Sequence, residues 1–359
     1  MINTYPLIRP LLFSLDPEEA HDFSLAQLDR LERCGLLRAL IGKPIIKPVE
    51  LCGLRFRNPV GLAAGLDKDG KHIDALASLG FGFLEIGTVT PLPQPGNPKP
   101  RMFRLPSAHA LINRMGFNND GVDACIERVK RSRFYQAGGV IGLNIGKNAS
   151  TPIEDATNDY ITCMRKVYPV ASYITANISS PNTKNLRDLQ GEAMLRKLLQ
   201  ALHQTRHDLS NQLGVRKPLF LKIAPDLEAV DLKLIADLLI EFEIDAVIAT
   251  NTTITRTGVE KLEHAQEMGG LSGSPVLARS NQTIHELFQV LHNRIPIIGV
   301  GGILSGENVK QKLDAGASLV QIYTGLIYQG PKLIQIVCGP FLKDFIRFSV
   351  VELPRLIYD

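Results

Sequence analysis

Short apolar runs, mostly of β-branched residues, alternate with segments of helical periodicity along most of this 359-residue chain. Each run is followed by glycine or polar residues, which is typical of buried strands that end in loops. The runs predict strands at residues 60–63, 81–87, 140–143, 173–176, 219–223, 246–249, 297–300 and 319–322. Apolar positions at helical spacing predict helices at residues 70–79, 155–167, 192–209, 228–239, 280–292 and 307–315.

Eight strands that alternate with helices over roughly 280 residues favour an α/β fold, the (β/α)8 TIM barrel. A doubly wound open sheet stays the alternative, because periodicity does not show whether the sheet closes. Residues 49–59 predict a small hairpin ahead of the barrel. Residues 91–100 contain five prolines, so they predict an extended connection over the mouth of the barrel.

The first 47 residues have a different pattern and form a separate predicted segment. Asp16 is a candidate helix cap, Pro17 suits the first helical position, and Gly35 suits a helix end. We expect two short amphipathic helices here, packed on the main domain or lying in a membrane surface. The predicted domains are therefore an N-terminal helical extension, residues 1–47, and a barrel domain, residues 48–359.

Composition narrows the class of protein. Hydrophobic residues make up 45% of the chain, enough for a large core, and the net charge of +4 comes without a basic run. We therefore expect no nucleic-acid partner. The five cysteines are widely spaced and form no C-x-x-C pair, and no signal peptide or membrane-spanning run is visible. His203 and His207 have the spacing of a metal pair but lack a third ligand, so we expect no metal.

Candidate chemistry follows the strands, where barrel enzymes build their sites. The residues at these positions are Lys68, Thr88, Asn144, the segment 176–182, Lys222 within the fifth strand, Thr250, Asn251, Thr252, Gly302, Tyr323 and Thr324. The glycines after the seventh strand and the Thr-Gly pair after the eighth predict a phosphate site. Two lysines inside a barrel need an anion or an electron-rich group. A flavin mononucleotide (FMN) supplies both, with Lys222 beside the N1/C2=O region of its ring.

Eight segments, in order along nearly the whole chain, resemble the dihydroorotate dehydrogenases and, among them, the class 2, quinone-reducing, membrane-associated enzymes. They are residues 61–70 (GLAAGLDKDG), 87–91 (GTVTP), 95–105 (PGNPKPRMFRL), 112–119 (INRMGFNN), 177–183 (NISSPNT), 249–253 (ATNTT), 269–273 (GGLSG) and 300–303 (VGGI). Residues 15–21 (LDPEEAH) resemble the class 2 extension.

The resemblance implies two sets of binding residues. FMN would be bound by Ala64, Gly65, Thr88, Asn144, Asn177, Lys222, Thr250, Gly273, Gly302, Tyr323 and Thr324. Dihydroorotate would be bound by Lys68, Asn113, Arg114, Met115, Gly116, Phe117, Asn177, Asn182, Asn251 and Thr252. Amide side chains suit this ligand, because a pyrimidinedione presents both N–H donors and C=O acceptors.

The resemblance also implies the chemistry and the location. Ser180 would be the base that removes the proton from carbon 5 of dihydroorotate while hydride leaves carbon 6 for the flavin. A serine hydroxyl needs a relay for its own proton, through a water or a threonine. His21, Arg104 and Tyr323 would lie near the quinone head, in an apolar tunnel formed by the extension. The implied protein is a peripheral membrane protein, at the cytoplasmic face of the inner membrane if bacterial, and we expect a monomer.

Other functions remain as alternatives. A soluble FMN barrel that uses fumarate or NAD is one, although Ser180 and the amphipathic extension count against it. An RNA-acting flavin barrel, similar to the dihydrouridine synthases, should carry a basic face and an RNA-binding domain. A non-catalytic phosphate-binding barrel should have lost Ser180, Lys68 or Lys222, and all three are present.

Overall fold

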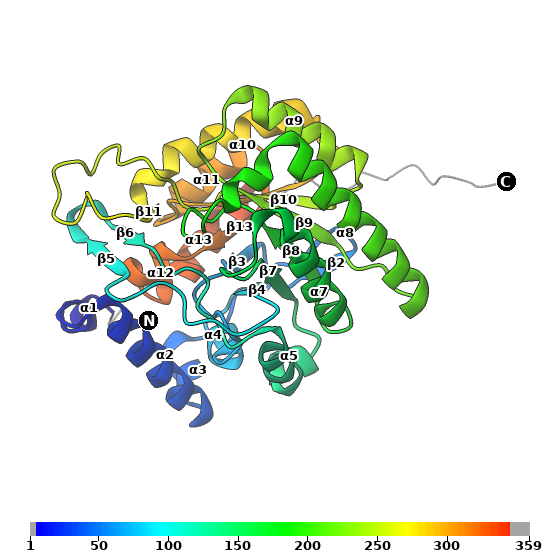
Figure 1. The fold of residues 1–359 in the computed structure, drawn as a ribbon. Helices are drawn as coiled ribbons and strands as arrows, with labels where there is room; N and C mark the ends of the chain where they lie inside the picture. Colours follow the sequence, from blue (N-terminus) through cyan, green and yellow to red (C-terminus); the bar gives the residue numbers. More distant parts are fainter. Residues whose placement is uncertain (1–4, 345–359) are drawn as a thin grey trace.

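A closed barrel of eight parallel strands forms the centre of the computed structural model, which describes residues 5–344 (Figure 1). The barrel order is β3, β4, β7, β8, β9, β10, β12 and β13, which pairs back to β3. Their bounds are Val60–Leu62, Phe83–Val89, Ile141–Ile145, Tyr173–Asn177, Leu219–Ile223, Ala246–Ala249, Ile297–Val300 and Ala317–Ile322. The eight predicted strands and the TIM-barrel fold are confirmed, and the open-sheet alternative was wrong.

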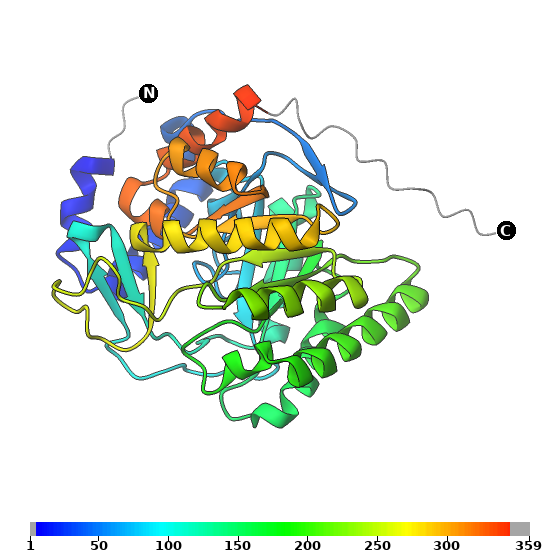
Figure 2. The same ribbon diagram turned by 90° about the horizontal axis from the view of Figure 1, so that it is seen from above.

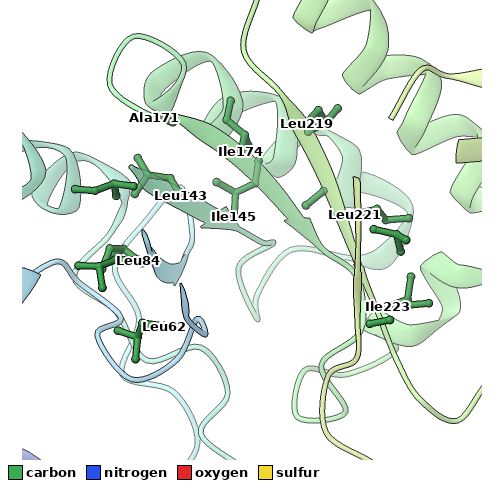
Figure 3. Packing of buried hydrophobic residues seen from close by; sticks show 14 of the residues in the cluster. Leu62, Leu84, Leu143, Ile145, Ala171, Ile174, Leu219, Leu221 and Ile223 are labelled. Carbon is green, nitrogen blue, oxygen red and sulfur yellow. The ribbon is translucent and has the colours of Figure 1, made fainter. Parts of the chain in front are cut away.

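Helices surround the barrel, as the view from above shows (Figure 2). They are α4 (Ile73–Ser78), α5 (Val122–Arg131), α6 (Arg133–Gln136), α7 (Ala156–Val167), α8 (Glu192–Leu213), α9 (Ala229–Glu241), α10 (Leu277–Leu291), α11 (Gly306–Asp314), α12 (Thr324–Gln329) and α13 (Lys332–Asp344). Outward strand residues such as Leu84, Leu143 and Leu221 pack beneath them in one continuous core (Figure 3). This layer buries the apolar stripe of each helix and fixes the strands from outside.

The inward positions of the barrel change from apolar to polar along each strand. Near the amino-terminal end, Phe83, Tyr173 and Phe220 fill the interior, with ring centroids 6.4 and 4.5 Å apart. Side chains alternate across a strand, so the next inward position lies two residues further on. These positions form a buried layer, here called the polar floor, of Glu85, Asn144, Thr175, Lys222 and Gln321.

The predicted hairpin closes the amino-terminal end of the barrel. Strands β1 (Val49–Leu51) and β2 (Leu54–Phe56) pair antiparallel, and Val49 and Phe56 belong to the interior cluster. The ring of Phe56 meets that of Phe83 edge to face at 4.9 Å. Residues 91–100 contain neither helix nor strand, as predicted. Only the carboxyl end of the barrel is therefore left to build a site.

A small antiparallel sheet, which sequence reasoning missed, stands beside that open end. It joins β5 (Met102–Leu105), β6 (Ala110–Asn113) and β11 (Gly270–Gly273). Each strand has only four residues, and β11 pairs with β6 across as many as 163 positions, so the sequence has no local signal for that pairing. The sheet carries Asn113 and Gly273 to the mouth of the barrel.

The N-terminal segment contains three helices, so the expectation of two was wrong. They are α1 (Tyr5–Phe13), α2 (Pro17–Arg33) and α3 (Leu36–Ile41), in dark blue in Figure 1. The predicted helix signals at Asp16 and Gly35 do not mark α1, and Pro10, a residue that usually breaks helices, lies inside it. Asp16 caps α2 as predicted, accepting from the N–H groups of Glu18 and Glu19 at 2.8 and 3.2 Å.

Specific polar contacts attach these helices to the barrel. Arg101, ahead of β5, makes a buried two-pronged pair with Glu18 of α2, at 2.7 and 3.1 Å. Tyr5 donates to the carbonyl of Ile327 in α12 at 2.5 Å. Residues 1–4 and 345–359, the outer ends of the two predicted domains, lie outside the described residues. Within residues 5–344, no helix has both the length and the apolar character needed to cross a membrane.

Candidate active site

The carboxyl ends of the barrel strands surround a pocket with a volume of ≈ 140 Å³, here called the strand-end pocket. Most of the residues predicted for FMN and dihydroorotate line it, although they come from loops far apart in the chain. They are Ala64, Gly65, Lys68, Thr88, Asn113, Met115, Gly116, Phe117, Asn177, Ser180, Asn182, Lys222, Thr250, Asn251, Thr252, Gly273, Gly302, Tyr323 and Thr324.

Two of the predicted residues, Asn144 and Arg114, do not line the pocket. Asn144 lies behind Thr88, whose hydroxyl donates to its Oδ1 at 2.5 Å, and its Nδ2 donates to Glu85 at 2.8 Å. Arg114 turns away to an ion pair with Glu267 at 2.6 Å. Asn144 therefore acts on the pocket only through Thr88, and Arg114 supports the wall from outside.

One end of the pocket is a cradle of backbone. Gly301 and Gly302 have φ angles of 114° and 75°, which favour glycine. A Cβ on Gly302 would lie 2.4 Å from the Cβ of Leu277, where α10 begins. Thr324 faces this end, and its hydroxyl donates to Ser272 Oγ at 2.9 Å. Backbone N–H groups at a helix start bind phosphate.

The floor of the pocket holds a buried ion pair. Lys222 Nζ lies 3.9 Å from Glu85 Oε1, and the two side chains are 5% and 0% exposed. Burial lowers the pKa of Lys222, and the Glu85 carboxylate opposes that shift. Lys222 makes no hydrogen bond to another side chain among the described residues, so its ammonium group can donate to a ligand.

The loop after β3 carries a second lysine into the pocket. Asp67 shapes this loop by accepting the backbone N–H groups of Asp69, Lys71 and His72, at 3.4, 3.0 and 2.8 Å. Lys68 lines the pocket, and burial lowers its pKa. Among residues 5–344, no carboxylate lies within ion-pair distance of Lys68, which leaves it suited to an anionic ligand.

Ser180 lies in the wall of the pocket, in the loop that follows β8. Its side chain is largely buried, and its Oγ accepts the backbone N–H of Asn182 at 3.2 Å. That contact leaves the hydroxyl proton of Ser180 available to another acceptor. Three residues on, the hydroxyl of Thr183 is buried without a hydrogen-bond partner among the described residues.

Arg187 holds the Ser180 loop against two neighbouring loops. Its guanidinium donates to the carbonyls of Ser179 at 3.1 Å and Thr252 at 2.8 Å. The third contact is an ion pair with Asp226 at 2.7 Å, and Asp226 also accepts from the hydroxyl of Thr253. One side chain therefore joins the loops after β8, β9 and β10 directly beside the pocket.

Amide side chains line the middle of the pocket and contact one another. Asn182 donates to Asn113 at 3.2 Å, and Asn251 donates to Asn177 at 3.3 Å. Four buried oxygens of pocket residues have no hydrogen-bond partner among the described residues. They are Asn182 Oδ1, Thr250 Oγ1, Thr252 Oγ1 and Gln321 Oε1. Buried polar atoms are rarely left unpaired, so the pocket fits ligands with several hydrogen-bonding groups.

A second cavity, of ≈ 520 Å³ and here called the helix-side cavity, lies between the N-terminal helices and the barrel. Its lining is mostly apolar and includes Ile8, Leu12, Phe13, Leu25, Leu28, Leu66, Leu76, Leu111 and Leu326. His21 and Arg104, two of the three residues predicted for the quinone, lie in this lining. The third, Tyr323, lines the strand-end pocket instead.

Two polar groups of the helix-side cavity, His21 and Arg104, belong to the N-terminal helices or bond to them. Burial, with a smaller contribution from Lys68, lowers the pKa of His21 to about 3, so the imidazole is neutral near pH 7. Arg104 donates to the carbonyls of Leu12 and Leu15, and its guanidinium lies 4.8 Å from the ring centre of Phe13. His21 thus offers the cavity a neutral imidazole and Arg104 offers it a cation, in mostly apolar surroundings.

The two cavities share a thin wall. In the loop after β3, Gly65 and Lys68 line the strand-end pocket, while Leu66 between them lines the helix-side cavity. The same division recurs at the start of α12, where Thr324 faces the pocket and Leu326 faces the cavity. A group in one cavity is therefore separated from the other by about one layer of side chains.

Sequence reasoning missed Glu85, Gln321, Arg187 and Asp226. Glu85 and Gln321 lie inside strands, whereas most of the predicted site residues follow the strand ends. The alternation of inward positions could have found them, because each follows an inward apolar residue by two. Arg187 and Asp226 are joined by a contact between separate loops, for which the sequence has no local signal.

The cysteines and histidines show no sign of a metal site in the part of the chain that the structure describes. All five cysteines are free thiols. Within residues 5–344, no three His, Cys, Asp or Glu side chains are placed to hold a metal ion. The Nδ1 atom of His203 lies 3.0 Å from the carbonyl of Phe242.

Comparisons with known families and with known sequences point to the same family. Residues 47–343 match the family described as dihydroorotate dehydrogenase. A protein of Polynucleobacter asymbioticus named dihydroorotate dehydrogenase (quinone) is 66% identical over 334 residues, which cover 93% of this chain and 97% of the relative. A protein of the same name from Ralstonia nicotianae is 58% identical over 335 residues, 93% of this chain and 97% of that one.

Solved structures agree with these matches. The ligand-free DHODH of Eimeria tenella aligns with a TM-score of 0.82 at 38% identity, over 91% of this chain and 94% of that one. The same protein in complex with ferulenol aligns with a TM-score of 0.82 at 38% identity, over 91% of each chain.

Proposed function

This chain belongs to the quinone-dependent dihydroorotate dehydrogenases, and from that premise we propose how its two cavities divide the reaction. The enzyme oxidises dihydroorotate to orotate in pyrimidine biosynthesis and passes the electrons to a quinone. We propose that the strand-end pocket holds flavin and dihydroorotate together, and that the helix-side cavity admits the quinone. The observation that carries this division is the thin wall between a polar and an apolar cavity.

The strand-end pocket fits FMN, in a family that depends on flavin. Gly301 and Gly302 line the pocket with backbone, which suits a phosphate, while Lys222 and the unpaired oxygen of Gln321 can bond a polar ring. Bound FMN would supply the hydride acceptor and the electron donor to quinone. The residues proposed to hold it are Ala64, Gly65, Thr88, Asn177, Lys222, Thr250, Gly273, Gly302, Tyr323 and Thr324, with Asn144 supporting Thr88 from behind.

The amide-rich side of the pocket is proposed to bind dihydroorotate. Lys68 lines the pocket and would pair with its carboxylate, because no carboxylate among residues 5–344 lies within ion-pair distance of this lysine. Asn113, Asn177, Asn182 and Asn251 would meet the N–H and C=O groups of the ring, as amides serve as donors and acceptors. Thr252, Met115, Gly116 and Phe117 complete the proposed site, and Arg114 supports its wall from outside.

Ser180 is proposed as the base that takes the proton from carbon 5. A hydroxyl is a weak base, so its own proton must leave as the carbon proton arrives. We propose Thr183 as the relay, directly or through a water, since its buried hydroxyl has no other partner among the described residues. Burial of both side chains excludes competing bulk water from the step.

The helix-side cavity is proposed to be the quinone tunnel, with His21 and Arg104 at the head group. Tyr323 would lie across the wall, beside the flavin, and would not touch the quinone. Leu7, Leu11, Leu36 and Leu40 of α1 and α3 are exposed apolar residues near the cavity. We propose that they dip into the surface of a membrane, so that residues 1–47 act as an attachment module and 48–359 as the catalytic domain.

The proposal is tested by giving the purified full-length protein dihydroorotate and following orotate formation. We expect turnover with a short-chain ubiquinone analogue and little with fumarate. Ala20 is buried in α2 and lines the helix-side cavity, so Ala20→Phe should raise the KM for the quinone without slowing flavin reduction. Ala193→Phe, at an exposed position of α8, serves as the control. Preference for fumarate, or an unchanged quinone KM in Ala20→Phe, would contradict the tunnel.

A further inference from the structure

Glu85 is a fully buried carboxylate at the centre of the polar floor, directly beneath the strand-end pocket. It accepts hydrogen bonds from Asn144 at 2.8 Å and from Gln321 at 2.8 Å. Tyr173 and Thr175 donate to it at 3.2 and 3.4 Å. An ionised carboxylate only accepts, so each of these partners must turn a donor toward it.

The first consequence runs through Asn144 to the amides of the pocket. With its Nδ2 on Glu85, Asn144 presents its oxygen to the hydroxyl of Thr88. The Thr88 oxygen, its proton committed, accepts from Asn177 Nδ2 at 2.9 Å. Asn177 must then turn its own oxygen toward Ser179 and Asn251, which donate to it at 3.1 and 3.3 Å. The donor and acceptor ends of three side chains are thus fixed from one carboxylate.

The second consequence concerns Gln321, which lines the pocket itself. Because Nε2 of Gln321 donates to Glu85, its Oε1 is the other end of the amide, and this buried oxygen has no partner among the described residues. Gln321 therefore offers the pocket an acceptor. A neutral amide in place of Glu85 could donate as well as accept. The Gln321 amide could then rotate and turn either its oxygen or its nitrogen toward residue 85.

Charge gives Glu85 a further effect. Lys222 lies 3.9 Å from it, and both side chains are nearly or fully buried. A buried charge acts strongly on its surroundings, since little water screens it. Glu85 thus offsets the positive charge that Lys222 brings to the pocket.

We propose that Glu85 is the positioning residue of the strand-end pocket, which fixes the hydrogen-bonding faces of Asn177 and Gln321 and balances the charge of Lys222. The inference rests on the proposed function, because it concerns the binding of flavin and of dihydroorotate or orotate in this pocket. Glu85 does not line the pocket, so it acts without touching a ligand, through these side chains and through its charge.

The test is Glu85→Gln. This variant keeps the shape of the side chain, removes its negative charge, and replaces two acceptor oxygens with one acceptor and one donor. The midpoint potential of the bound flavin should become more positive, because loss of a nearby negative charge favours the reduced form. Calorimetry should show orotate and flavin each binding about tenfold more weakly. Lys222→Met should shift the potential in the opposite direction.

The control is Asp245→Asn, which removes another largely buried carboxylate, at the amino-terminal end of the barrel beside Arg206 and Arg216. It should leave the flavin potential at the wild-type value. A purely structural Glu85 would lower the melting temperature and the flavin content but leave the potential of the bound flavin unchanged. That outcome in Glu85→Gln would overturn the proposal.

A second variant covers the case in which Glu85→Gln does not fold. Gln321→Leu removes one amide that Glu85 orients and leaves the charges in place. Flavin should bind about tenfold more weakly to it, and wild-type affinity would overturn the orientation argument. The wild-type protein tests the proposed function separately from the role of Glu85. If it binds no flavin or forms no orotate, the proposed function fails. If it is active and the variants are unchanged, only the role of Glu85 is refuted.

Discussion

The strand-end pocket and the helix-side cavity lie side by side, yet they are built on opposite principles. The pocket is made of polar side chains whose orientations are fixed by one another and by Glu85. The cavity is made mostly of apolar side chains, from the N-terminal helices on one side and the barrel domain on the other. A hydrogen-bonded pocket selects by placing donors and acceptors, while an apolar cavity selects by shape and by exclusion of water.

The difference also appears in what each region tolerates. A buried amide or carboxylate that loses its partner keeps the full cost of its desolvation, so changes in the pocket propagate. Apolar side chains repack with little loss if total volume is kept. We therefore expect substitutions in the pocket to act on the chemistry, and substitutions around the cavity to act on quinone use.

The largest expected effect is in the pocket, at Ser180. Ser180→Ala should reduce flavin reduction by dihydroorotate by about 10²–10⁴, the usual contribution of a positioned base. The variant should keep its flavin, because the cradle at Gly302 is untouched. Stopped-flow absorbance of the flavin measures this step. Ser172→Ala, at the other end of β8, is the control, and an equal loss there would remove Ser180 from its proposed role.

The next largest effect should distinguish the helix-side cavity from the strand-end pocket. Deletion of residues 1–40 should lower quinone turnover by about a hundredfold, since the cavity loses one wall and its positioning groups. The rate of flavin reduction by dihydroorotate should also fall, but by a smaller factor. Arg101 would lose Glu18, and Arg101 also donates to the carbonyls of Pro95 and Asn97, beside the substrate loops.

A companion variant separates these effects. Arg101→Met in the truncated protein should restore much of the flavin reduction, because an apolar side chain removes the unpaired buried charge. Steady-state kinetics with a quinone analogue and stopped-flow reduction, on the same preparations, measure the two half-reactions. Full quinone turnover in the truncated protein would contradict the tunnel.

A smaller effect is expected at the clamp beside Ser180. Arg187→Met should lower the rate of flavin reduction by about tenfold, because the base and the loop of Thr252 lose their common support. Flavin affinity should change little. Arg196→Met, which breaks a half-exposed pair with Glu241 on the surface, should leave the rate unchanged. An Arg187 variant with the wild-type rate would show that the loop holds its place without the clamp.

The smallest effect concerns stability around the cavity. His21 has a pKa near 3 when folded and an ordinary value of 6.5, so below pH 6.5 the unfolded chain binds a proton that the folded chain refuses. Stability from this group is present above pH 6.5 and is lost as pH falls toward 3. His21→Leu should reduce the stability difference between pH 7.5 and 5.5 by about 1.4 kcal/mol, measured by denaturant unfolding. Replacement of the exposed His285 should not.

The barrel was predictable because its strands are apolar runs closed by polar loops, and β9, β10 and β12 have the predicted bounds. The small sheet of β5, β6 and β11 was not, since β5 and β6 are short and β11 joins them from a distant part of the chain. The helix α1 was hidden by Pro10, which local rules interpret as a break.

The pocket was similarly predictable in part. Side chains that follow strand ends, such as Thr88 and Asn177, converge because parallel strands of a barrel end at the same rim. Glu85 and Gln321 lie one layer lower and could have been found by the period of two. The clamp at Arg187 and the orientations of the amides could not, because they arise from contacts between loops that only the folded barrel brings together.

The pairing of Glu18 with Arg101 bears on how such a chain can be recombined. A chimera that joined this barrel to the helical segment of another protein would inherit a guanidinium whose counter-charge belongs to the discarded part. The graft would need an acidic residue at the second position of its incoming helix, or a neutral side chain in place of Arg101. Extension and barrel are therefore exchangeable only as a matched pair.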